Sequence, residues 1–149
     1  MFFPFRQSEQ IKLVAFRNKN PEDIPGSELQ AYLDKIKIGI TNFSENDFDE
    51  VATLDSVAID ALTDIIYNYS YKKEPYSSHD TACYEPRNAI IFTDGQSKII
   101  AFIELCFGCD KFRSSHKELD LGKYCINKFD LLKEIFAKSN IKFGITTEE

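Results

Sequence analysis

Two cysteines, Cys106 and Cys109, stand with two residues between them at the end of an apolar segment. A third cysteine, Cys83, lies shortly before the preceding apolar segment, residues 88–93. CxxC spacing suits a metal site, a thiol redox couple or a disulfide. Cysteine also packs well as a small buried side chain. The sequence leaves all of these readings open, and each assigns the protein a different function.

The three sulfurs are expected to converge because the intervening chain predicts a β-hairpin. Residues 88–93 and 98–107 are rich in β-branched and aromatic side chains, which are typical of strands. Asp94 and Gly95 between them favour a tight turn. The hairpin would carry Cys83 back toward the end of the second strand.

Two strand registers are compatible with this hairpin, and they favour different chemistry. With a two-residue turn Cys83 faces Cys106, at a separation that suits a disulfide. With a four-residue loop Cys83 faces Gly108, so that Cys83 and Cys106 become diagonal neighbours. That spacing suits two ligands of one zinc ion better than a disulfide. In both registers Cys83 and Cys106 are expected on the same side of the sheet.

A structural zinc site usually has four ligands, and CxxC is a common half of one. Cys83 with His79, His116 or Cys125 would complete the set, and His79 is the expected fourth ligand. The sequence contains no second CxxC and no HxxxH motif. A dithiol oxidoreductase normally has its pair at a helix N-terminus, whereas this pair follows an antiparallel strand. We therefore expect no cofactor, with a zinc ion as the alternative.

Arg87 and Glu104 are expected on the same sheet face as Cys83. With the four-residue loop they lie opposite each other and form a cross-strand ion pair. Alternatively, Arg87 contacts a carboxylate or phosphate beside the cysteines, because guanidinium suits bidentate contacts to anions.

The charge distribution suggests a binding surface. The formal net charge is -6, which argues against nucleic acid as a partner. Residues 43–64 carry seven acidic side chains and no Lys or Arg, so we expect an acidic face that docks a protein with a basic surface. The residues expected to bind this partner are Glu45, Asp47, Asp49, Glu50, Asp60 and Asp64.

No catalytic set is evident in the chain. It lacks GxSxG, the P-loop, GxGxxG and HExxH, so no nucleophile, cofactor cradle or metalloprotease helix is indicated. We therefore expect a protein-interaction or inhibitor-like (immunity-like) binding module more than an enzyme. The alternative function is a structural zinc site or thiol redox centre at the cysteine cluster.

The chain of 149 residues suits one α+β domain spanning 1–149. Apolar residues recur every three or four positions in 55–70 and 121–139, which predicts two principal helices. We expect a mostly antiparallel sheet of about five strands and a helical turn near 27–33. The candidate strands are 11–16, 37–43, 48–54, 88–93, 98–107 and a short 142–146.

The location expected from the sequence is cytoplasmic. No apolar run approaches the roughly 20 residues of a membrane span. The first residues lack a basic leader and are too short for a secretory signal. An exported protein whose leader had been removed would present the same features.

Overall fold

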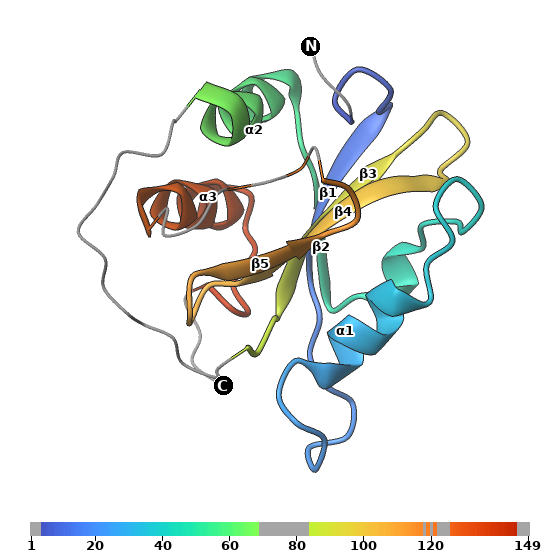
Figure 1. Ribbon diagram of the computed structural model, residues 1–149, viewed down its shortest axis with the longest axis vertical. Coiled ribbons are helices and arrows are strands. Elements are labelled where there is room, and N and C mark those ends of the chain that lie inside the picture. The colour runs from blue at the N-terminus through green and yellow to red at the C-terminus, as the bar shows by residue number, and fades with distance from the viewer. Residues whose placement is uncertain (1–3, 69–83, 118, 120, 122–125, 146–149) are drawn as a thin grey trace.

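An antiparallel sheet lies at the centre of the fold (Figure 1). The computed structural model describes residues 4–68, 84–117, 119, 121 and 126–145. The strand order is β2-β1-β3-β4-β5, and every neighbouring pair is antiparallel. The strands are β1 (Gln10–Ala15), β2 (Glu50–Thr53), β3 (Asn88–Thr93), β4 (Ile99–Cys106) and β5 (Lys111–Ser114). The expected α+β class with about five strands is confirmed.

Helices cover both faces of the sheet (Figure 1). α1 (Ser27–Asp34) lies on one face, and α2 (Ser56–Asn68) and α3 (Ile126–Lys138) lie on the other. The sequence periodicity located α2 and α3, and it indicated α1 as a helical turn. Residues 69, 70 and 122–125 of the expected helices lie outside the described part of the chain.

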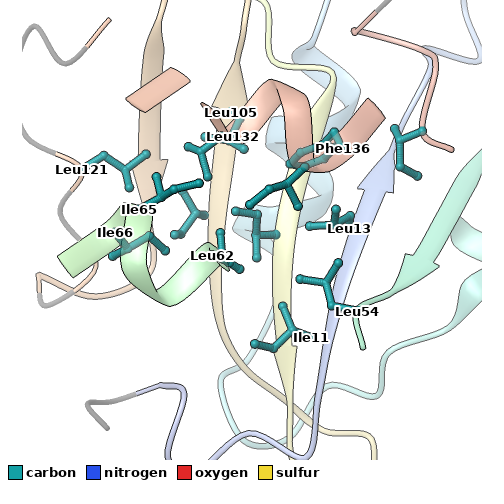
Figure 2. Packing of buried hydrophobic residues seen from close by; sticks show 14 of the residues in the cluster. Ile11, Leu13, Leu54, Leu62, Ile65, Ile66, Leu105, Leu121, Leu132 and Phe136 are labelled. Atoms are coloured by element: carbon teal, nitrogen blue, oxygen red, sulfur yellow. The ribbon is translucent and has the colours of Figure 1, made fainter. Parts of the chain in front are cut away.

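The larger core lies between the sheet and the pair α2 and α3, as Figure 2 shows. Leu13 and Leu105 project from the strands, and Leu62, Leu132 and Phe136 project from the helices. All five side chains are fully buried. On α2 the buried residues Leu62, Ile65 and Ile66 lie on one side of the helix, and on α3 Leu132 and Phe136 are four residues apart. Burying these two apolar faces fixes both helices on the sheet.

The smaller core lies between the sheet and α1. Leu29 and Leu33 of α1 pack with Val14, Ile91 and Phe102 of the strands. Because both sheet faces are covered, β1 buries five consecutive residues and lacks the usual alternation of polar and apolar side chains.

The expected strand at 37–43 does not form, so the predicted hairpin with 48–54 is wrong. The carbonyl of Lys37 accepts the backbone N–H groups of Ile40 and Thr41, both at 2.9 Å. Gly39 has φ of 79°, a left-handed conformation that glycine adopts without strain. These bonds wind the segment into a turn, and β2 pairs with β1 instead.

The sheet ends on a strand that the sequence pattern did not indicate. β5 has only four residues, all half-buried, which is too short for a clear alternation. The expected strand at 142–146 does not form over residues 142–145, and residue 146 lies outside the described range. Lys142 and Phe143 instead donate backbone N–H groups to the Glu50 carboxylate, each at 2.8 Å. No helix among the described residues has the length and apolar character needed to cross a membrane.

Truncation of Leu62 should test the larger core. Leu62 is fully buried, so Leu62→Ala leaves a cavity and should lower the free energy of unfolding by about 2–5 kcal/mol. Val57 lies on the same helix but is 77% exposed, so Val57→Ala should change the free energy of unfolding by less than about 0.5 kcal/mol. Chemical denaturation of both variants measures the difference, and equal effects would contradict the observed packing.

Candidate functional site: a cysteine pair in the β4–β5 hairpin

The hairpin formed by β4 and β5 brings Cys106 and Cys109 together. Cys106 is the last residue of β4 and faces Lys111, the first residue of β5. The four residues between them form the turn, and Cys109 is the third of these. The two sulfur atoms are 2.6 Å apart. Cys106 and Cys109 are called the cysteine pair below.

The two members of the cysteine pair differ in accessibility. Cys106 is buried, with 1% of its surface exposed. Cys109 is half-buried in a turn whose neighbouring residues, Gly108 and Asp110, are both exposed. Asp110 has φ of 50°, a left-handed conformation that Asp tolerates better than most residues. This conformation helps a turn of only four residues to close.

Phe107 anchors the hairpin on the face that carries α3. Its ring makes edge-to-face contacts with Phe129 and Phe136 of α3, with centroids 6.1 and 5.3 Å apart. Successive strand residues point to opposite faces, so Phe107 points toward α3 while Cys106 points toward the face of α1.

A buried ion pair anchors the hairpin on the other face. Glu104 is fully buried on β4, and Arg113 lies directly opposite it on β5. Arg113 Nε and Nη2 donate to the two Glu104 oxygens at 3.1 and 2.9 Å, which is a bidentate contact. Arg113 also forms an ion pair with Asp34 at the end of α1. The pair therefore connects β4, β5 and α1.

Tyr84 completes the hydrogen bonding of the buried carboxylate. Its hydroxyl donates to Glu104 Oε1 at 2.7 Å. Burial, followed by the negative charge of Glu104, raises the pKa of the Tyr84 phenol well above its ordinary value. Cys106 makes a smaller contribution that raises the pKa in the same direction. Tyr84 remains a protonated donor over the physiological range.

Arg113 remains charged beside this carboxylate. Burial by itself opposes the charged form, but hydrogen bonds to Glu104 and Asp34 outweigh it and raise the pKa of the guanidinium. The positive charge therefore persists at every pH at which the protein is folded.

The predicted pairing of Arg87 with Glu104 is wrong. The structure pairs Ala89 with Glu104, which differs by two residues from the register expected for a four-residue loop. Five residues, 94–98, separate β3 from β4, and a β-bulge near Thr93 shifts the register by one more position. Arg87 Nη2 lies 3.9 Å from the Glu85 carboxylate, and Glu104 binds Arg113.

Of the four expected zinc ligands, the structure brings Cys106 and Cys109 together. Cys83 and His79 lie outside the described residues, as does Cys125. His116, another candidate, has its Nδ1 atom 2.7 Å from the Ser115 hydroxyl. Over the described part of the chain, no three residues of the types His, Cys, Asp and Glu gather closely enough to hold a metal ion.

The acidic residues expected to bind a partner divide into two groups. Glu45 and Asp47 lie in a short 3-10 helix, η1 (Glu45–Asp47), on the side of α1, where the hydroxyl of Tyr32 donates to Asp47 at 2.8 Å. Asp60 and Asp64 are exposed on α2, which covers the opposite face of the sheet. The structure does not bring these two groups together.

Two further acidic residues bond within the fold. Asp49 accepts hydrogen bonds from the backbone of Arg17 and from Lys19 Nζ. Glu50 accepts the two N–H groups described above. Six carboxylates were expected to bind a partner, and three of them, Asp47, Asp49 and Glu50, accept hydrogen bonds within the fold.

Sequence reasoning missed Arg113, Tyr84 and Asp34. An acidic residue in the middle of an apolar strand was the available signal, because a buried carboxylate requires a cation and donors nearby. The identity of the cation could not be deduced, since β5 was not recognised as a strand.

Comparison with protein-family models, with curated proteins and with solved structures finds no significant match to this chain.

Removal of Arg113 should destabilise the protein strongly. Arg113→Ala leaves the Glu104 carboxylate buried without its cation, which should cost on the order of 3 kcal/mol of unfolding free energy. Lys138→Ala is the matched control, because Lys138 pairs with Glu134 on the exposed side of α3 and should contribute less than about 0.5 kcal/mol. Urea denaturation at neutral pH measures both, and a loss below about 1 kcal/mol for Arg113→Ala would contradict the assigned role.

Proposed function

We propose that the protein acts in thiol–disulfide exchange, with the cysteine pair alternating between a dithiol and a disulfide. The observation that carries this proposal is the 2.6 Å separation of the two sulfurs in a hairpin turn that is exposed on both sides of Cys109. Closing the bond from this geometry requires little movement of the backbone.

The separation favours sulfur–sulfur chemistry over zinc ligation. A disulfide bond is about 2.05 Å long. Two thiolates bound to one tetrahedral zinc ion at about 2.3 Å lie roughly 3.8 Å apart. The two sulfurs are in contact in the turn, so forming a bond between them requires only a small approach, whereas zinc ligation would require them to move apart.

A purely structural disulfide is a weaker explanation for the pair. The stabilisation that a disulfide gives through chain entropy grows with the length of the loop that it closes. A loop of only four residues gains about 2 kcal/mol, and the hairpin already has Phe107 and the Glu104–Arg113 ion pair as anchors. Reversible chemistry is therefore the better use of this pair.

The proposed exchange balances with a disulfide, R–S–S–R′, as the oxidant. One thiolate of the pair attacks a sulfur of this disulfide, forms a mixed disulfide and releases R′–SH after protonation. The second cysteine then attacks the mixed disulfide and releases R–SH. The net reaction oxidises two protein thiols to one disulfide and reduces R–S–S–R′ to two thiols.

The geometry supports an acidic docking surface less well. Asp47, Asp49 and Glu50 already accept hydrogen bonds within the fold, which leaves fewer acceptor sites on each carboxylate for a basic partner. Glu45 and Asp60 are exposed but belong to the two separate groups. This hypothesis therefore ranks second to thiol–disulfide exchange.

The proposal is tested by equilibrating the full chain in mixtures of reduced and oxidised glutathione. After acid quenching, alkylation and trypsin digestion, Ile99–Lys111 is the peptide that holds Cys106 and Cys109 and no other cysteine. This peptide should carry an internal disulfide whose fraction rises with the proportion of oxidised glutathione, and Cys109→Ser should abolish it.

Two outcomes would contradict the proposal. One is a peptide Ile99–Lys111 that is alkylated at both cysteines in every glutathione mixture. The other is one zinc ion per chain in native mass spectrometry, together with protection of both thiols from alkylation until a chelator is added.

A further inference from the structure

We infer that Cys109 is the thiol that attacks the substrate disulfide and that Cys106 is the thiol that resolves the mixed disulfide. This assignment rests on the proposed function and adds an order of events to it. The residue nearer the C-terminus reacts first, so the two cysteines work in the reverse of their order along the chain.

Accessibility separates the two roles. An attacking sulfur must approach the substrate along the line of the S–S bond that breaks, so it needs open space in front of it. Cys106 is 1% exposed and cannot receive a disulfide carried by another molecule. Cys109 is half-buried and lies between two exposed residues, so a disulfide can reach it from solvent.

The space beside Cys109 is open. A methyl group added at Gly108 would meet no heavy atom within 4 Å apart from those of its neighbours Phe107 and Cys109. No other described segment therefore covers the turn at Gly108, which leaves room there for a substrate that approaches Cys109. This access suits a disulfide in a small molecule or in an exposed loop, because one buried in a folded surface could not enter the narrow turn.

The resolving role of Cys106 follows from its fixed position. Phe107 is held by α3 and Glu104 is held by Arg113, so the residues on both sides of Cys106 have little freedom to turn it outward. Its sulfur, 2.6 Å from that of Cys109, is already placed to attack a mixed disulfide formed there. That attack forms the Cys106–Cys109 bond, breaks the bond between Cys109 and the substrate, and releases the substrate sulfur as a thiol.

The two single-cysteine variants of the pair distinguish the roles. With a chromogenic nitrobenzoate disulfide as the probe, Cys106→Ser should accumulate a stable mixed disulfide on Cys109 within peptide Ile99–Lys111. In Cys109→Ser the same peptide should react at Cys106 at least about tenfold more slowly, because a buried thiol reacts only after local opening. Oxidised glutathione as a second probe should give the same order.

Wild-type protein provides the comparison. Its peptide should end as the internal disulfide, with the mixed disulfide present only transiently. Cys83 and Cys125 fall on other tryptic peptides and do not affect the reading. Circular dichroism and thermal melting establish that each variant is folded, and Cys106→Ala replaces Cys106→Ser if the serine hydroxyl disrupts the buried site.

The possible results separate the order of attack from the proposed function. Faster adduct formation on Cys106 than on Cys109 would overturn the order and leave the exchange function intact. A stable adduct on Cys109 in wild-type protein, with no internal disulfide, would overturn both the resolving role and the exchange function. A transient wild-type adduct together with a trapped adduct in Cys106→Ser supports the assignment.

Discussion

Glu104 lies fully buried near the end of β4, and the ion pair that it forms with Arg113 determines how the chain continues beyond that strand. A carboxylate at this depth is costly unless a cation and hydrogen-bond donors surround it. Arg113 meets this need only when β5 lies beside β4 with Arg113 opposite Glu104. That register sets the turn at four residues and so places Cys109 over Cys106.

The same ion pair links the hairpin to the rest of the fold. Asp34 at the end of α1 binds the outer side of Arg113, and Tyr84 donates to Glu104 from the segment that leads into β3. On the opposite face, Phe107 packs against α3. The hairpin is thus fixed from both faces of the sheet, while its tip remains exposed. A reactive pair benefits from this arrangement, because the sulfurs are held in place and one of them can still be reached.

Local sequence patterns were sufficient to locate the helices that bury one apolar face and the strands that consist of a continuous apolar run. Leu62, Ile65 and Ile66 recur at helical spacing and located α2, and the apolar runs located β3 and β4. The CxxC spacing at the end of β4 indicated the cysteine pair. The turn after Lys37 was missed because the alternation of apolar residues resembles a strand, whereas the backbone hydrogen bonds wind the segment up.

Non-local features could not be deduced in the same way. A fifth loop residue and a bulge near Thr93 together changed which residue faces Glu104, and no sequence pattern marks either of them. β5 has only four residues, too few to show the alternation of apolar and polar side chains that marks a strand, so Arg113 was not assigned to a strand. The internal bonds of Asp47, Asp49 and Glu50 depend on neighbours distant along the chain, which charge counting does not reveal.

The most direct test of this account is the ¹³Cβ chemical shift of Cys106 and Cys109, followed by NMR as the protein is titrated from reducing to oxidising thiol buffer. Both shifts should change from the thiol to the disulfide range at the same buffer ratio, while the backbone amides of β3, β4 and α3 outside the turn stay in place. Shifts that remain in the thiol range, or that change independently for the two cysteines, would contradict the claim that this hairpin holds one exchanging pair.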